Sequence, residues 1–238
     1  MAQESKRPLI IPAIAKHTAT VIFVHGLGDT GYGWKFVADM LSPAMPHVKW
    51  ILPHAPQRRV TANCGMLMPA WFDLKDYSFE SAEDEEGMLG SVRILEDIVR
   101  QEVESGIESS RIVLGGFSQG GTMSLLTGLT CAFQLGGVAV LGGRLVLRER
   151  VKAMMSDHAK SLPIFWGHGT ADPLVRLELA TKSVDYLVNC GLTRLRRNEI
   201  GSPGLMFVGY RGVEHSSCQE ELNDLGEFLK RVLIIAED

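Results

Sequence analysis

Short apolar runs alternate along this chain with longer segments in which apolar residues recur every three or four positions. The runs are rich in β-branched residues, and the run 21–24 is apolar at every position. A strand that is apolar throughout is typical of a parallel sheet buried on both faces. The pattern predicts an α/β fold with a mainly parallel central sheet and helices on both faces. Strands are expected at 20–25, 48–53, 112–117, 137–141, 163–167 and 205–210.

The predicted helices lie between these strands. The segment 85–104 carries an apolar stripe with the period of a helix, and the acidic run 83–86 predicts a solvent-exposed start for it. Pro173 is expected to open another helix, with Asp172 as its cap. A last helix is expected from about Gln219, capped by the serines just before it.

Length and composition indicate one globular domain. The 238 residues, 45% of them apolar, predict a single domain over 1–238, in which 1–17 form an N-terminal extension with room for a short first strand. A net charge of −4 argues against a nucleic-acid partner, which requires a basic face. The basic cluster within 194–204 is interpreted as an exposed loop. The four cysteines show no paired metal-ligand spacing and are predicted to be reduced, buried thiols.

Targeting signals are not visible in the sequence. The first residues are not followed by the apolar segment of a secretory signal, and no run approaches the roughly 18 apolar residues of a membrane span. We therefore expect a cytoplasmic protein, with the nucleus as a second compartment, that contacts membrane surfaces at most transiently.

The stretch 115–121 carries the strongest chemical signal. It reads Gly-Gly-Phe-Ser-Gln-Gly-Gly, between an apolar strand and a helix-like segment. This is the context of a nucleophile elbow, in which Ser118 stands at the apex of a sharp turn. Gly116 and Gly120 flank the serine where side chains would collide. The alternative is a glycine-rich turn with a serine cap, so the interpretation depends on the rest of the chain.

Two further residues complete a serine-hydrolase arrangement. A serine needs a base, and the base needs an acid to orient it. Asp172 and His215 follow Ser118 in the order found in α/β-hydrolases, each just after a predicted strand. Asp157 and Asp185 compete for the acid position but are not at strand ends. Three earlier histidines are predicted to support loops: His25, His54 and His168.

Acyl transfer also requires donors for a developing oxyanion. The backbone N–H of Gln119 is one expected donor because it follows the nucleophile. The second is expected in the glycine-containing loop after the first predicted strand, where the N–H of Leu27 is our choice. A plain glycine turn is the alternative for that loop.

Two motifs together make the chain similar to a known family. They are Gly-Phe-Ser-Gln-Gly-Gly at 116–121 and His-Ser-Ser-Cys-Gln at 215–219, and further matching blocks lie at 21–31, 52–56, 68–73 and 172–175. The chain resembles the acyl-protein thioesterases, also called lysophospholipase-carboxylesterases, within the α/β-hydrolases. The resemblance implies a cytosolic serine hydrolase, without metal or cofactor, that cleaves long-chain acyl thioesters from S-acylated proteins and also hydrolyses lysophospholipids and simple esters. It implies the same triad and oxyanion donors.

The resemblance also implies an acyl-binding pocket. Its lining is expected from Met66, Met68 and Trp71, and from Leu174 beside the acid, although ordinary core packing is the alternative for each. Arg144 stands in the same region where the family has an aromatic residue, and Val146 replaces a proline, so the acyl-chain preference stays open. Some family members carry a lipidated cysteine at position 2, where this chain has Ala2 and no such anchor is expected.

Two other functions remain open at this point. One is a short-chain carboxylesterase whose acyl tunnel is truncated by Arg144, and the other is a catalytically inactive module that binds acyl lipids. A weak homodimer is compatible with all three interpretations.

Overall fold

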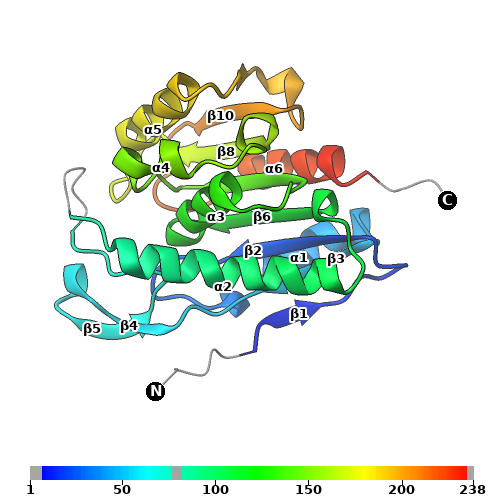
Figure 1. Ribbon diagram of the computed structural model, residues 1–238, viewed down its shortest axis with the longest axis horizontal. Coiled ribbons are helices and arrows are strands. Elements are labelled where there is room, and N and C mark those ends of the chain that lie inside the picture. The colour runs from blue at the N-terminus through cyan, green and yellow to red at the C-terminus, as the bar shows by residue number, and fades with distance from the viewer. Residues whose placement is uncertain (1–6, 77–81, 235–238) are drawn as a thin grey trace.

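A computed structural model of the protein describes residues 7–76 and 82–234 (Figure 1). The interpretation of Ala2 therefore lies outside the described residues, as does the start of the N-terminal extension. An eight-stranded sheet runs through the molecule, with β1 at one edge and β9 at the other. In spatial order its strands are β1 (Leu9–Ile11), β3 (Val48–Leu52), β2 (Ala19–Val24), β6 (Ile112–Phe117), β7 (Gly137–Leu141), β8 (Pro163–Gly169), β10 (Gly204–Tyr210) and β9 (Arg194–Leu195).

The sheet is parallel except at one edge. Only β1 pairs antiparallel, with β3, and the other pairs of neighbours are parallel. The mainly parallel α/β fold is therefore confirmed, and all six predicted strands are present within two residues of their expected ends. The interpretation of 194–204 as a loop was incomplete, because β9 adds a short edge strand there. Two residues are too few to produce a recognisable alternation.

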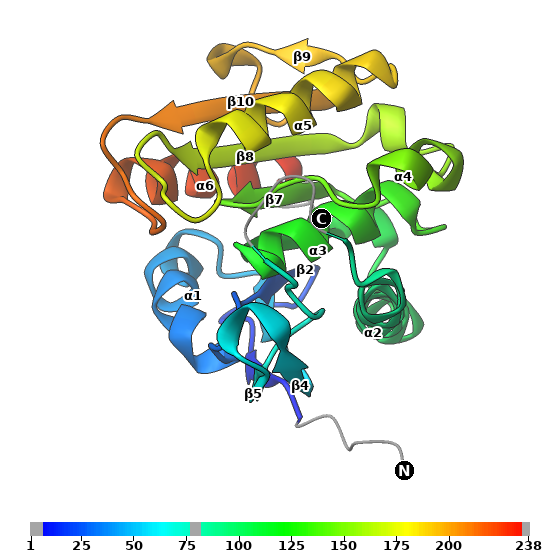
Figure 2. The same ribbon diagram turned by 90° about the vertical axis from the view of Figure 1, so that its left-hand side faces the viewer.

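Six α-helices cover the two faces of the sheet among the described residues, as Figure 2 shows for α1 and α6 on one side and α2 on the other. Helices α1 and α6 contribute to one apolar core, whereas α2 to α5 contribute to the other. Their bounds are α1 (Lys35–Leu41), α2 (Glu85–Glu104), α3 (Gln119–Thr130), α4 (Arg148–Met154), α5 (Leu177–Asn189) and α6 (Gln219–Val232).

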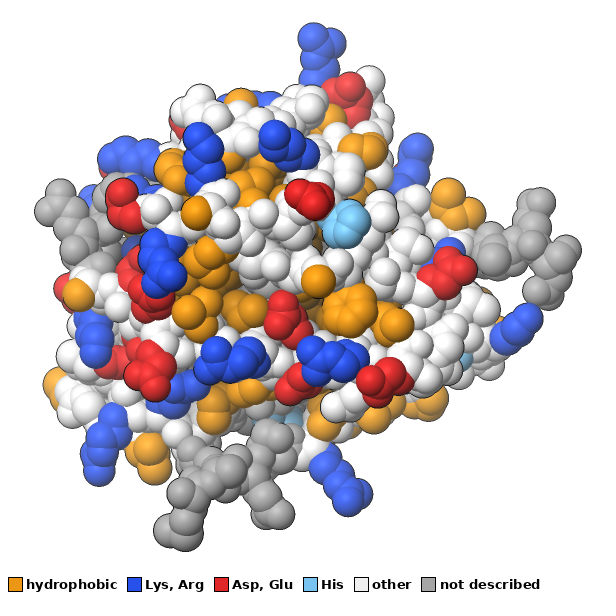
Figure 3. Space-filling model, in the orientation of Figure 1, with side chains coloured by type: hydrophobic (Ala, Val, Ile, Leu, Met, Phe, Trp, Pro, Cys, Tyr) orange, Lys and Arg blue, Asp and Glu red, His pale blue; other side chains and the backbone are white. Residues whose placement is uncertain are grey.

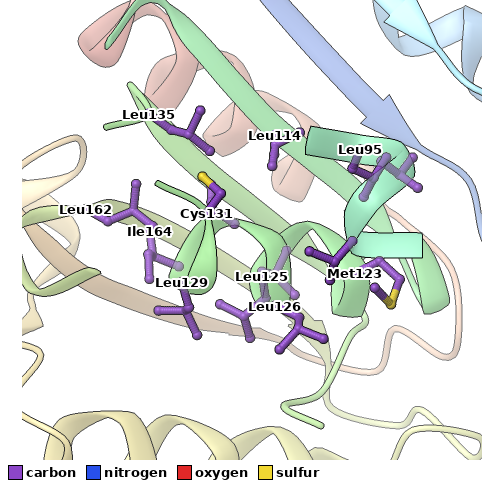
Figure 4. Packing of buried hydrophobic residues seen from close by; sticks show 14 of the residues in the cluster. Leu95, Leu114, Met123, Leu125, Leu126, Leu129, Cys131, Leu135, Leu162 and Ile164 are labelled. Carbon is purple, nitrogen blue, oxygen red and sulfur yellow. The ribbon is translucent and has the colours of Figure 1, made fainter. Parts of the chain in front are cut away.

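Strand alternation produces the two cores. On β2, Ile22 and Val24 belong to one cluster and Val21 and Phe23 to the other, and all four are buried. Figure 4 shows the apolar side chains of α3 packed among Leu95 of α2 and residues of the sheet. Burying one large apolar side chain contributes roughly 1.5–3 kcal/mol, so helix α3 is held mainly by tertiary packing.

A separate two-stranded hairpin follows β3. Its strands are β4 (Gln57–Val60) and β5 (Met66–Pro69), paired antiparallel outside the main sheet. The sequence predicted an apolar pocket segment here but no hairpin. Two arginines in β4 and two exposed residues in β5 hide the alternation of a half-buried strand.

Two expected helix starts were wrong. Helix α5 begins at Leu177, four residues after Pro173, and the intervening residues form a turn. The N-cap position of α6 is Cys218, with no capping bond from its side chain, so the serines before it do not cap that helix. Before helix α2, Glu83 is exposed, as predicted. It also accepts a hydrogen bond from the N–H of Leu147, which was not predicted.

The four cysteines differ in their exposure. All four cysteines are free, but only Cys131 is buried, and burial raises the pKa of its thiol to about 11. Cys64 is exposed, contrary to the prediction. Lysine, arginine and acidic side chains are interspersed on the face that carries α2 (Figure 3). Within the described ranges, no helix is both long and apolar enough to cross a bilayer.

Candidate active site

Ser118 occupies a strained turn between β6 and α3. Its backbone has φ 55° and ψ −119°, a conformation that residues other than glycine rarely adopt. The flanking glycines make the turn possible. A Cβ atom on Gly120 would lie 2.0 Å from the carbonyl oxygen of Val24, and one on Gly116 would lie 2.5 Å from the same oxygen. The nucleophile elbow expected from the motif is thus present as a backbone geometry.

The sheet topology brings the candidate residues to one edge. Ser118 follows β6, and the loop from His25 follows β2, its neighbour in the sheet. The chain leaves β2 toward α1 on one face and β6 toward α3 on the other, which creates the crevice typical of ligand sites in open α/β sheets. Asp172 and His215 follow β8 and β10, whose carboxyl ends lie at the same edge.

Three side chains form a continuous hydrogen-bonded chain. The Oγ of Ser118 lies 2.8 Å from Nε2 of His215, and Nδ1 of His215 lies 2.6 Å from Oδ2 of Asp172. The carboxylate can only accept, so the ring donates from Nδ1 and its Nε2 accepts from the serine hydroxyl. Such an arrangement can remove the hydroxyl proton as the oxygen attacks an acyl carbon.

Asp172 is buried and held in its charged form. Burial alone would raise the pKa of its carboxyl, but hydrogen bonds from His215 and from the N–H groups of Val175 and Leu174 outweigh that effect and lower it. Both N–H groups lie 2.9 Å from Oδ1. The competing acids, Asp157 and Asp185, are both exposed.

All three earlier histidines support loops around this site, and Nδ1 of His54 accepts from the N–H of Gly31 at 3.1 Å. Nδ1 of His25 donates to the carbonyl of Gly26 at 2.7 Å, and its Nε2 accepts from the N–H of Ala55 at 3.0 Å. His168 is buried and donates from Nε2 to the carbonyl of Val175 at 2.7 Å. Burial lowers the pKa of His25 and of His168, so both of these rings are neutral at pH 7.

The loop after β2 lies directly against the serine. A Cβ atom on Gly26 would lie 3.3 Å from the Cβ of Ser118, and Leu27 and Gln119 both line the cavity beside the serine. Gly28 has φ +78° and donates its N–H to the carbonyl of Pro69. The loop therefore lies against the serine, and the two residues whose N–H groups are the candidate oxyanion donors both line the same cavity.

The side chain of Gln119 makes contacts that sequence reasoning missed. Its Oε1 accepts from the N–H of Trp71 and its Nε2 donates to the carbonyl of Phe72, each at 3.0 Å. The residue after the serine therefore ties the segment after the β4–β5 hairpin to the start of α3. The motif indicates the backbone position of this glutamine, but nothing local in the sequence indicates partners 47 and 48 residues away.

Comparison with known proteins assigns the family. Residues 5–233 match the family described as Phospholipase/Carboxylesterase. The chain belongs to this family. It is 48% identical over 222 residues to acyl-protein thioesterase 1 of Cryptococcus neoformans, covering 91% of this chain and 93% of that protein. Identity to acyl-protein thioesterase 1 of Neurospora crassa is 42% over 239 residues, covering 96% and 93%.

Solved structures agree with the assignment. The crystal structure of Zea mays acyl-protein thioesterase 2 superimposes with a TM-score of 0.83 at 27% identity, covering 95% of this chain and 99% of that one. Arabidopsis thaliana SOBER1 gives a TM-score of 0.82 at 30% identity, covering 90% and 99%. This member of the phospholipase/carboxylesterase family therefore has the α/β-hydrolase fold.

A cavity of about 590 Å³ opens beside Ser118, within the usual range for small-molecule sites. Of the predicted lining residues, Met68, Arg144 and Leu174 line it. Met66 does not, because it is 58% exposed on the hairpin, and Trp71 does not, because it is buried and its indole donates to the carbonyl of His25. Both assignments were wrong.

The lining of the cavity comes from both faces of the sheet. Its aliphatic members include Leu74, Leu174, Val175 and Leu179, and Thr122 and Arg144 also line it. Its aromatic members include Trp34, Phe36, Phe72 and Phe117. The ring of Phe117 also lies 4.8 Å from the ring of His215. The lining beside the serine is thus a mixture of aliphatic and aromatic side chains.

Proposed function

We propose that this protein is an acyl-protein thioesterase that hydrolyses long-chain acyl thioesters on S-acylated proteins, with lysophospholipids and simple esters as further substrates. The observation that carries the proposal is the hydrogen-bonded chain from Ser118 through His215 to Asp172. The names of the relatives, thioesterases at 40–48% identity, support the substrate class.

Ser118 acts as the nucleophile in the first half-reaction. As its oxygen attacks the thioester carbonyl, Nε2 of His215 takes the hydroxyl proton and Asp172 stabilises the resulting imidazolium. The carbonyl oxygen becomes an oxyanion that the N–H groups of Leu27 and Gln119 stabilise. The tetrahedral intermediate then collapses, the carbon–sulfur bond breaks, and the imidazolium returns its proton to the departing cysteine thiolate.

Water completes the cycle in the second half-reaction. His215 removes a proton from a water molecule, whose oxygen attacks the acyl carbon on Ser118 through a second oxyanion. The bond to the serine oxygen breaks, the imidazolium protonates that oxygen, and the fatty acid leaves. The buried carboxylate of Asp172 keeps the ring in the correct tautomer in both halves.

The aliphatic residues that line the cavity are suited to a fatty tail. Each methylene transferred from water contributes about 0.8 kcal/mol, so the tail supplies most of the affinity for the substrate. Leu74, Val175 and Leu179 are aliphatic residues of the lining that such a tail can contact.

Labelling with a short-chain fluorophosphonate tests this proposal. We expect the wild-type protein to be labelled and to release palmitate from an S-palmitoylated peptide, and we expect the peptide to slow labelling by competition. Ser118→Ala should abolish both reactions and leave the circular dichroism spectrum unchanged. A wild-type protein that binds the peptide but neither labels nor hydrolyses it is the binding module considered above, and the proposal is then wrong.

A further inference from the structure

The turn that carries Asp172 is fixed at its start but open after the acid. Before Asp172, the backbone N–H groups at positions 170 and 171 donate to carbonyls at the end of β10 and in the loop that follows it. After Asp172, positions 173 and 174 are exposed. The N–H groups of Leu174 and Val175 bond Oδ1 of Asp172, each at 2.9 Å, so they fix the carboxylate only relative to its own turn. A further contact must hold this part of the turn against the sheet.

His168 supplies that contact. It stands in β8, where its backbone pairs with Gly209 of β10, and its ring is fully buried. Because a carbonyl can only accept, the ring donates from Nε2 to the carbonyl of Val175, 2.7 Å away. Among the described residues, this is the only hydrogen bond that joins positions 173–176 to the sheet. Val175 therefore connects two groups, since its carbonyl is held by His168 and its N–H holds Asp172.

The ring of His168 makes this bond alone. Its Nδ1 is buried and has no hydrogen-bond partner within the part of the chain that the structure describes. Its Nε2 lies 3.7 Å from Oδ2 of Asp172, the oxygen that accepts from His215, and this distance is too long for a hydrogen bond. Burial lowers the pKa of the ring, so it is neutral and does not compete with His215 for the carboxylate.

We infer that His168 is a positioning residue for the catalytic acid: by holding the carbonyl of Val175, it sets where the carboxylate of Asp172 meets His215. The inference rests on the proposed function, in which Asp172 orients the catalytic ring. Val175 also lines the cavity, so the same bond holds part of the cavity wall. A displacement of about 1 Å near the reacting groups can lower a rate by about 100-fold, so loss of this bond should lower kcat.

Three substitutions of His168 separate the donor from the bulk of the ring. His168→Met fills the site and removes the donor. His168→Gln keeps a donor N–H at the place of Nε2, and His168→Asn keeps an amide that is too short to reach Val175.

His47→Met is the matched control. His47 is also buried, donates from Nε2 to a carbonyl, that of Leu233 at 2.8 Å, and has an Nδ1 without a partner among the described residues. It directly precedes β3, at the amino end of the parallel strands, whereas the candidate active site lies at their carboxyl ends.

We expect kcat for a soluble butyryl ester to fall about tenfold or more in His168→Met, and to stay within about threefold of wild type in His168→Gln and about twofold in His47→Met. Both methionine variants should lose thermal stability, because each loses a buried hydrogen bond. A second readout is the proton NMR resonance of the ring N–H that His215 donates to Asp172, which a short hydrogen bond moves downfield. It should move upfield in His168→Met and stay in place in His47→Met.

If His168→Met does not fold, His168→Asn carries the same expectations. The inference is overturned if the variant without the donor keeps both kcat and the resonance, if His168→Gln loses as much activity as His168→Met, or if His47→Met does so. A failure of the proposed function is seen separately, as a wild type that is neither labelled nor able to turn over any ester. The resonance would still report the position of Asp172 in that case.

Discussion

The nucleophile elbow and the β4–β5 hairpin border the same cavity but are built in opposite ways. The elbow lies between strand β6 and helix α3, whose residues are buried except near the serine, and its glycines touch the backbone of β2. The hairpin stands outside the main sheet, and Met66 and Leu67 are 58% and 62% exposed. Atoms that must react are fixed by core packing, whereas two neighbouring side chains of the hairpin face solvent.

Removing the negative charge of Asp172 should have the largest effect on activity. Asp172→Asn favours the wrong tautomer of His215, and we expect kcat to fall by a factor on the order of 10⁴ with little change in stability. Steady-state kinetics and thermal denaturation measure the two quantities. A loss of less than tenfold would mean that the acid does not orient the ring.

A buried acid close to the candidate active site should make stability depend on pH. Glu221 in the first turn of α6 packs against Gly167, and burial raises the pKa of its carboxyl to about 8. Between its ordinary pKa near 4.5 and pH 8, the folded state binds more protons than the unfolded chain, so the free energy of unfolding falls as pH rises. Because a tenfold change in a proton-binding constant corresponds to about 1.4 kcal/mol, the total fall is a few kcal/mol.

Glu221→Gln tests this pH dependence because the amide keeps an acceptor and cannot ionise. Relative to wild type, urea denaturation should show the variant gaining a few kcal/mol of stability between pH 5 and pH 8. Glu220→Gln, on an exposed neighbour, should show no such gain. If the unfolding free energies of wild type and Glu221→Gln depend on pH in the same way, the carboxyl ionises normally in the folded state and the prediction is wrong.

Matched glycine substitutions compare the two regions directly. Gly120→Ala forces a Cβ atom to within 2.0 Å of a backbone oxygen of β2, and we expect a loss of about 3 kcal/mol, the upper end of overpacking. In Gly65→Ala in the hairpin, the new Cβ atom has no neighbour within 4 Å. The expected loss of stability is about 1–2 kcal/mol and comes only from the positive φ of 70°. Chemical denaturation separates them, and equal losses would remove the distinction between the two regions.

Polar substitutions on the hairpin should have the smallest effect. Met66→Ser with Leu67→Ser changes two exposed side chains, and we expect the unfolding free energy to stay within about 0.5 kcal/mol of wild type. Turnover of a soluble butyryl ester should change less than twofold. A loss of several kcal/mol would show that these side chains are packed in solution.

The parts of the fold that sequence predicted are those with strong periodicity. The strand at 112–117 and the helix at 85–104 were predicted with the bounds that the structure shows, because both are long and clearly patterned. Strands β4, β5 and β9 were missed, because half-exposed or very short strands carry no clear alternation.

The candidate site was also predicted only in part: the triad was predicted, but the wall of the cavity was not. Chain order at strand ends was enough to predict that Ser118, Asp172 and His215 would meet, because parallel strands place their carboxyl ends together. The wall of the cavity could not be predicted residue by residue. Trp71 and Met68 are three positions apart in one apolar segment, yet only Met68 lines the cavity. Which way a loop side chain points depends on distant partners such as the carbonyl of His25.

Gln119 links the start of α3 to the segment that follows the β4–β5 hairpin. Its main chain follows the serine directly, and its amide group bonds both Trp71 and Phe72 beyond the hairpin. Replacement by an apolar residue would keep the main-chain N–H but would remove both side-chain bonds, leaving the N–H of Trp71 and the carbonyl of Phe72 without these partners. The residue that offers its backbone N–H to the oxyanion therefore also holds the segment after the hairpin through its side chain. Variants designed to widen the cavity near Trp71 and Phe72 would have to keep this amide.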